Sequence, residues 1–133
     1  MIVVEPAGEI AAWMSAKIGM RFRPPYTTMA FKRAGKIVAA FLFHSWTDND
    51  IEVCVAADDM PRPLLRAAYV YVTEQLGCSR ATYLTREDNA AAVLALARCG
   101  AREEGRLRRF YADGADALVF GILKEEFPYG KRT

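Results

Sequence analysis

The stretch Gly77–Gly105, GCSRATYLTREDNAAAVLALARCGAREEG, holds a strand, a polar turn, a helix and the start of another strand. Its segment Arg80–Arg86 is rich in β-branched and aromatic residues, which predicts a strand. The polar Glu87-Asp88-Asn89 suits the start of a helix, and Asn89–Cys99 carries apolar residues at helical spacing. Gly100 suits the left-handed residue that ends a helix. A strand-to-helix-to-strand unit is therefore predicted here.

Working outward from this unit, hydrophobic periodicity and turn residues predict the remaining elements. We expect strands at Met1–Val4, Thr27–Arg33, Lys36–Trp46, Asp50–Ala56, Arg80–Arg86, Glu103–Tyr111 and Ala117–Lys124, and helices at Glu9–Ile18, Leu64–Leu76 and Asn89–Cys99. The order is β-α-β-β-β-α-β-α-β-β. This order predicts an α/β (α+β) fold with a mixed, mostly antiparallel sheet of six to seven strands and helices on both faces.

Composition narrows the class of protein. A chain of 133 residues that is 53% hydrophobic suits one domain, which we expect to span residues 1–133. A net charge of +2 does not indicate a nucleic-acid or membrane partner. No apolar run is long enough to span a bilayer and the start lacks signal-peptide features, so a cytoplasmic protein is expected.

Cysteine usage and the chain end add two expectations. The three cysteines are far apart in sequence and have one histidine among them, so we expect buried thiols, no disulfide and no metal site. The tail Glu125–Thr133, which includes Phe127 and Tyr129, is expected to be loosely ordered.

The block from Asn89 to Arg109 resembles the Gcn5-related N-acetyltransferase (GNAT) superfamily, most closely the branch that acetylates protein N-termini and its small bacterial and phage relatives. Asn89, Gly100, Glu104-Gly105 and the arginines from Arg106 onward match that branch in spacing, with Ala101 where the family usually has phenylalanine. The resemblance covers about the C-terminal two thirds of the chain. It implies a GNAT fold and transfer of an acetyl group from acetyl-coenzyme A to an amine by direct attack.

The resemblance also implies a cofactor site. The family holds the pyrophosphate on a glycine-rich turn before the second helix, but this chain has Asp58–Pro63 (DDMPRP) there. Arg62 and Arg66, one helical turn apart, are the candidates for phosphate binding. The alternative is that Asp58 or Asp59 caps the helix and the arginines form a solvated face.

Further site residues follow from the same resemblance. Backbone groups of Val53, Cys54 and Val55 would face the thioester where two strands diverge, and Asn89 would contact the cofactor arm. Asn89 also suits a helix N-cap, and both roles can hold together. Glu52 matches the family's strand glutamate and is the candidate base; an exposed, ion-paired residue is the alternative. His44 is a second candidate base or a structural residue.

Three hypotheses for function stay open. The first is an acetyl-coenzyme A-dependent N-acetyltransferase acting on an amine of a protein or small molecule, with a homodimer left open. The second is a catalytically inactive GNAT-fold binding or assembly module of phage or prophage origin, favoured by the glycine-free loop and by the absence of a tyrosine from Asn89–Cys99. The third, nucleic-acid binding through Arg102, Arg106, Arg108 and Arg109, competes with a solvated strand edge.

Overall fold

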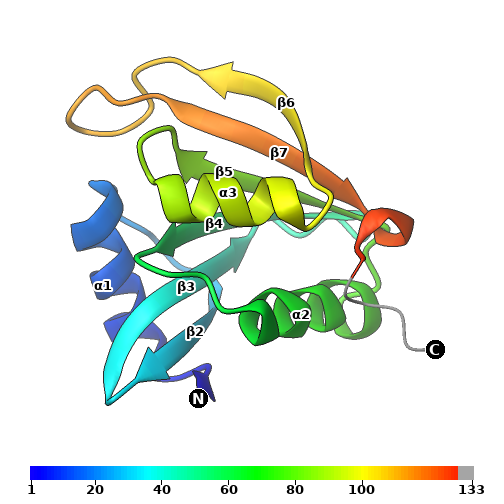
Figure 1. Ribbon diagram of the computed structural model, residues 1–133, viewed down its shortest axis with the longest axis horizontal. Coiled ribbons are helices and arrows are strands. Elements are labelled where there is room, and N and C mark those ends of the chain that lie inside the picture. The colour runs from blue at the N-terminus through cyan, green and yellow to red at the C-terminus, as the bar shows by residue number, and fades with distance from the viewer. Residues whose placement is uncertain (129–133) are drawn as a thin grey trace.

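One seven-stranded sheet forms the centre of the molecule, in the order β1-β2-β3-β4-β5-β7-β6 (Figure 1). The computed structural model describes residues 1–128. The strands are β1 (Ile2–Val3), β2 (Thr27–Arg33), β3 (Lys36–His44), β4 (Asp50–Ala57), β5 (Arg80–Arg86), β6 (Arg102–Leu107) and β7 (Ala117–Leu123). All neighbouring strands are antiparallel except β4 and β5, which run parallel. The predicted mixed, mostly antiparallel sheet is therefore confirmed.

Helices cover both faces of the sheet, as predicted. They are α1 (Ala7–Ile18), α2 (Arg62–Val70), which continues as the π-helical turn Tyr71–Gln75, and α3 (Ala90–Arg98). Helix α1 packs on one face, and α2 and α3 pack on the other (Figure 1). The connections from β4 to β5 and from β5 to β6 thus place their helices on the same side.

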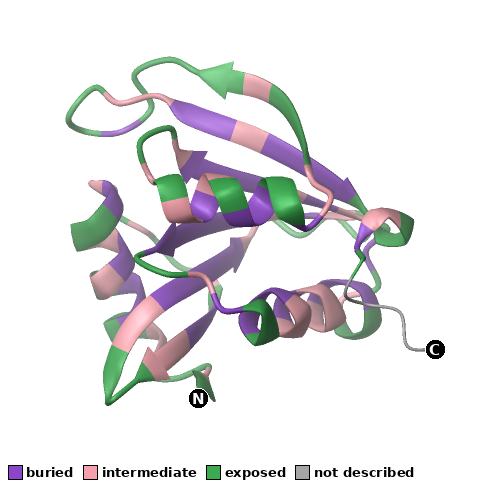
Figure 2. Cartoon of the chain, in the orientation of Figure 1, coloured by how far each residue is buried: buried purple, intermediate pink, exposed green. Residues whose placement is uncertain are grey.

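Side chains alternate between these two faces along each central strand. Ala40, Leu42, Cys54, Ala56 and Leu84 belong to the cluster under α1. Phe41, Phe43, Val53, Val55 and Tyr83 belong to the cluster under α2 and α3. Figure 2 shows the resulting buried centre of the sheet. The nearly continuous apolar run of β3 is explained by this burial on both faces.

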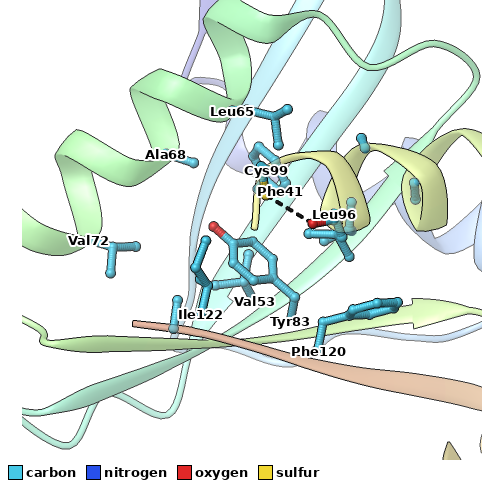
Figure 3. Packing of buried hydrophobic residues seen from close by; sticks show 14 of the residues in the cluster. Phe41, Val53, Leu65, Ala68, Val72, Tyr83, Leu96, Cys99, Phe120 and Ile122 are labelled. Carbon is cyan, nitrogen blue, oxygen red and sulfur yellow. Dashed lines mark hydrogen bonds between the residues drawn. The ribbon is translucent and has the colours of Figure 1, made fainter. Parts of the chain in front are cut away.

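Tyr83 lies in the middle of the α2/α3 cluster. Its ring packs edge-on against Phe41, with the ring centroids 5.9 Å apart, and lies among Val53, Leu96 and Phe120 (Figure 3). Burial raises the pKa of its hydroxyl well above the usual range. Tyr83 is therefore a core residue.

Several element ends differ from the predictions. Strand β3 ends at His44 and not at Trp46, because Ser45 adopts a positive φ of 56°. Strand β6 ends at Leu107, so the predicted extension to Tyr111 is wrong; Arg109 has φ of 53° and turns the chain. Arg108 and Arg109 therefore lie in the loop that leads to β7.

The second helix also begins earlier than predicted. Helix α2 starts at Arg62 with Pro61 at its N-cap, and Pro63 lies in the first turn, where proline is well tolerated. The alternative in which Asp58 or Asp59 caps this helix is wrong. Helix α1 likewise starts two residues before the predicted Glu9, after Pro6 at its N-cap.

The two edge strands of the sheet are short or charged. Strand β1 has only two residues, Ile2 and Val3. Strand β6, REEGRL, has exposed charged side chains along most of its length. Arg106 pairs with Glu87 and Asp116, so this arginine is engaged in ion pairs within the chain. This arrangement favours the solvated-edge interpretation of the arginines over a phosphate-binding one.

The segment after β7 docks against α2 and lies close to Gly100, just after α3. Lys124–Glu126 form a 3-10 turn, and Phe127 is buried and stacks on Tyr69 with ring centroids 4.4 Å apart. The Tyr69 hydroxyl donates a hydrogen bond to the Lys124 carbonyl oxygen at 2.8 Å. The predicted loose tail is thus wrong for this segment, while Tyr129 and the residues after it lie outside the described part.

Gly100 provides a stability test, because it approaches this docked segment closely. It has φ of 92°, and a Cβ there would lie 2.6 Å from the carbonyl oxygen of Glu126. Gly114 is a matched control, with φ of 91° and no atom within 4 Å of the same position. Both alanine variants incur left-handed strain of about 1 kcal/mol, and Gly100→Ala should lose about 1–3 kcal/mol more through overpacking.

Urea unfolding of both variants measures the difference. Equal losses for Gly100→Ala and Gly114→Ala would contradict the close approach of Gly100 to Glu126.

Candidate active site

Pairing between the two parallel strands stops before either strand ends. The β4–β5 ladder runs from Asp50–Arg80 to Cys54–Leu84. Strand β4 continues to Ala57 and β5 to Arg86 without further pairing between them. Of the three predicted residues Val53, Cys54 and Val55, only Val55 lies beyond the ladder, and the backbone at Val53 and Cys54 remains within it. A gap opens between the strands at this point.

The side chain of Asn89 lies in this gap and bonds to the end of β4. Its Oδ1 accepts from the Ala57 N–H at 3.0 Å, and its Nδ2 donates to the Ala57 carbonyl oxygen at 2.7 Å. Asn89 occupies the N-cap position of α3 as predicted, but its side chain makes no cap hydrogen bond. The amide instead continues the hydrogen bonding of β4 where β5 has diverged.

One cavity lies on each face of the sheet in this part of the molecule. On the α2/α3 face, a cavity of about 290 Å³ lies between the loop before α2 and helix α3, lined by Met60, Leu65 and Leu94 among others. On the α1 face, a cavity of about 450 Å³ is lined by Lys17, Arg86, Asp88, Asn89 and Asp113 among others. The α1-face cavity borders the end of β5 through Arg86 and Asn89, whereas the other cavity lies between α2 and α3.

The aspartates before α2 are neutralised by ion pairs. Asp58 pairs with Lys17 of α1 at 2.6 Å, and Asp59 pairs with Arg33 at the end of β2. The backbone N–H groups of both aspartates donate to the Val38 carbonyl oxygen. Asp58 and Asp59 therefore fix the loop to the sheet, and their charges are compensated.

The first turn of α2 has few amides to offer an anion. Pro63 has no N–H, and the N–H groups of Leu64 and Leu65 both donate to the Pro61 carbonyl oxygen. Arg62 lines the cavity beside α3 and also a larger groove on the other side of α2, and Arg66 lines that groove. Phosphate binding at this helix would rest mainly on arginine side chains.

The larger groove, of about 1050 Å³, runs between α2 and the β1–β2 edge of the sheet. Its walls include Met29, Val70 and Tyr71. It is separate from the gap between β4 and β5, so its size does not make it the candidate active site.

Glu52, His44 and Cys54 form a cluster on the α1 face. His44 and Glu52 are cross-strand partners, with His44 Nε2 3.6 Å from Glu52 Oε2 and 3.8 Å from Cys54 Sγ. The Glu52 side chain is 41% exposed and that of His44 28%. Burial, with a smaller contribution from Glu52, raises the pKa of the Cys54 thiol to about 12. The thiol is therefore protonated at neutral pH.

Arg86 connects the segments around the α1-face cavity. It donates to the Ile18 carbonyl oxygen at the end of α1 and forms two-pronged pairs with Asp88 and Asp113. Its guanidinium also lies 5.2 Å from the ring centre of Tyr111, which is buried. The sequence predicted Arg86 only as a strand residue. Its role in joining these segments was not predicted, because its partners Ile18, Asp88 and Asp113 lie in three separate segments of the chain.

Comparison with known proteins gave matches to solved structures alone. Models of known protein families gave no match, and neither did curated protein sequences. A dodecameric structure of spermidine N-acetyltransferase from Vibrio cholerae matches with a TM-score of 0.73 and 14% identity, over 99% of this chain and 98% of that one. The chain has the GNAT fold.

Other GNAT-fold structures agree with this likeness. A mutant form of the Vibrio cholerae spermidine/spermine N-acetyltransferase matches with a TM-score of 0.69 and 13% identity, over 94% of this chain and 95% of that one. A protein from T. thermophilus that is described as an acetyltransferase matches with a TM-score of 0.65 and 21% identity, over 80% of this chain and 63% of that one. At these identities the likeness shows the fold.

The described residues contain neither a group that could hold a metal ion nor a helix suited to crossing a membrane. All three cysteines are free and buried, as predicted from their spacing. The candidate site is therefore built from backbone, carboxylate, imidazole, amide and guanidinium groups.

Asn89 should stabilise the fold through Ala57. Replacing Asn89 by alanine leaves the buried N–H and carbonyl of Ala57 without their partner, at a cost of about 1–3 kcal/mol of unfolding free energy. Asn49→Ala is the control, because the Asn49 side chain accepts one bond from Ser79 in an exposed turn. If the two variants lost the same stability in urea unfolding, the Asn89–Ala57 pairing would not be a structural bond.

The Arg86–Asp113 pair should make stability depend on pH in acid. Hydrogen bonds from Arg86, and then from the Ala115 N–H, lower the pKa of Asp113 to about 2. The stabilisation is therefore complete above the unfolded-state value of about 4 and is lost as pH falls towards about 2. The stability difference between wild type and Asp113→Asn should shrink across this interval. Unfolding midpoints at several pH values measure it, and a constant difference would contradict the pairing.

Proposed function

We propose that this chain is an N-acetyltransferase that transfers an acetyl group from acetyl-coenzyme A to an amine. The observation that carries the proposal is the end of the β4–β5 ladder at Cys54–Leu84, where the Arg86 and Asn89 side chains line a cavity on the α1 face. A second cavity lies between α2 and α3 on the other face. The GNAT fold, shared along nearly the full chain with a spermidine N-acetyltransferase, supports it. The acceptor is an amine of a small molecule or of a protein.

The arm of the cofactor would lie in the gap. Val55 would present backbone groups from β4, and the Asn89 amide, which already makes two bonds to Ala57, has one further N–H and one further acceptor position on its oxygen. Arg62, at the edge of the α2/α3-face cavity, would bind phosphate, and Arg66 would add positive charge farther along α2. When bound, acetyl-coenzyme A supplies an activated acyl group as a thioester.

Glu52 would act as the base for the attacking amine. Its side chain projects from the α1 face. Glu52 lies two residues before Cys54, the last residue of β4 that pairs with β5, so about 7 Å along the strand separates the two positions. A carboxylate at that distance acts on the amine through a water molecule. His44, 3.6 Å from Glu52, would pass the proton on to solvent or serve as the base itself.

Direct attack suits this site better than a covalent intermediate on cysteine. Cys54 is the thiol nearest the gap, and its pKa of about 12 leaves almost no thiolate at neutral pH. His44 is 3.8 Å from its sulfur, but the two do not form an ion pair, since burial keeps the thiol neutral. Amine and thioester would therefore react within one ternary complex.

A second candidate function is a GNAT-fold binding module without chemistry. The specific observation in its favour is the first turn of α2, in which Leu64 and Leu65 use their amides internally and Pro63 has none. The solved structures described above give no support to a phage origin.

Isothermal titration with acetyl-coenzyme A separates the two candidates. An enzyme should show saturable binding that Arg62→Ala weakens, because the arginine carries much of the phosphate contact. If no heat is observed at about 1 mM ligand, the Kd is weaker than about 1 mM, which corresponds to a binding free energy of about −4 kcal/mol. That result would leave the binding module as the better explanation.

Turnover tests the role of Glu52. Release of free thiol from acetyl-coenzyme A should be measured with spermidine and with a short peptide that has a free N-terminus. With the amine that reacts, Glu52→Gln should lower kcat by about 100-fold or more and leave acetyl-coenzyme A affinity unchanged. Glu103→Gln, on the exposed edge strand β6, is the control. If His44→Gln lost the activity and Glu52→Gln kept it, His44 would be the base.

A further inference from the structure

Thr85 has an unexplained hydroxyl at the point where β4 and β5 separate. It follows Leu84, the last residue of β5 that pairs with β4. Its residue exposure is 0%, and within residues 1–128 its Oγ1 is the buried side-chain polar atom that has no hydrogen-bond partner. Burial of a hydroxyl without a partner is unfavourable, because the group gives up its bonds to water.

Within the described part of the chain, the two other buried threonines differ from Thr85 in this respect. The Thr28 hydroxyl donates to the Val4 carbonyl oxygen at 3.0 Å, and the Thr73 hydroxyl donates to the Tyr69 carbonyl oxygen at 2.8 Å. Both hydroxyls are therefore accounted for by the fold itself. At position 85, valine would have the same shape, would suit a strand as well and would bury no polar group.

The position of Thr85 suggests a ligand as the missing partner. By strand alternation it faces the same side as Ala81 and Tyr83, which is the side of α2 and α3. The cavity of about 290 Å³ between α2 and α3 lies on that side of the sheet, although Thr85 itself does not line it. Across the gap, the ladder would have placed Val55 opposite Thr85 if it had continued by one more pair.

We propose that Thr85 is a cofactor-binding residue whose hydroxyl bonds an amide of the thiol-bearing arm of coenzyme A. The inference rests on the proposed function, which places that arm in the gap. A hydroxyl both donates and accepts, so it can bond either the N–H or the carbonyl of such an amide. Because Thr85 is fully covered, side chains at the gap move aside when the arm enters.

This assignment predicts opposite effects on stability and on binding. Thr85→Val removes a hydroxyl that has no partner in the free protein, so the melting temperature should stay equal or rise. The same change removes one bond to the ligand, so the Kd for coenzyme A should increase about tenfold. Thr85→Ser keeps the hydroxyl and should keep the wild-type Kd.

Thr28→Val is the matched control, since it removes a buried strand hydroxyl that has a partner. It should lower the melting temperature and leave the Kd for coenzyme A unchanged. Coenzyme A is titrated into each variant by calorimetry, and melting is followed without ligand.

The outcomes distinguish this inference from the proposed function. If the wild-type chain bound coenzyme A and Thr85→Val bound it equally well, this inference alone would be overturned. It would also be overturned if Thr85→Val lost as much thermal stability as Thr28→Val. If the wild-type chain bound no coenzyme A, the proposed function and this inference would both fail.

Discussion

The hydrogen bonding of β4 changes partner at Ala57, and the arrangement of the candidate site depends on that change. Up to Cys54 the strand pairs with β5, and at Ala57 it bonds to the side-chain amide of Asn89. One side chain thus satisfies the buried backbone groups that β5 leaves unpaired where the strands separate. Buried backbone groups are costly when unpaired, so a gap in a sheet needs a substitute of this kind.

Strand alternation then sorts the chemistry onto the two faces. Glu52, His44 and Cys54 face α1, whereas Thr85 faces α2 and α3. The Glu52–His44–Cys54 cluster and the unsatisfied hydroxyl therefore lie on opposite sides of one sheet. In the proposed function, the cofactor arm enters on the α2/α3 side and ends on the α1 side. It would meet the Thr85 hydroxyl first and Glu52 and His44 last. The arm can cross the sheet only through the gap, so the proposed function requires the gap.

Local sequence patterns were sufficient for most of the fold. The RATYLTR strand and the order of all ten elements were confirmed, because β-branched residues, turn residues and apolar spacing act within a few residues. The end of β6 was predicted wrongly, since the positive φ of Arg109 has no signature in its residue type. The docking of Phe127 on Tyr69 was also missed, because it joins residues far apart in the chain.

The candidate site was less accessible to sequence reasoning. Asn89 was placed correctly before α3, but its bonds to Ala57 depend on where β4 ends in space. Asp58 and Asp59 looked like helix caps because Lys17 and Arg33, their ionic partners, are distant in sequence. The sequence around Thr85 does not indicate that its hydroxyl lacks a hydrogen-bond partner, since threonine is an ordinary strand residue.

The two ends of the sheet limit how the molecule can associate with its own copies. Strand β1 has two residues, which is too few backbone groups to pair with a strand of another molecule. Strand β6 carries exposed acidic and basic side chains, and pairing with a second molecule would place them against the charged side chains of that molecule. Sheet extension from one molecule into the next is disfavoured at both borders. Any self-assembly of this chain would instead have to use helical or loop surfaces.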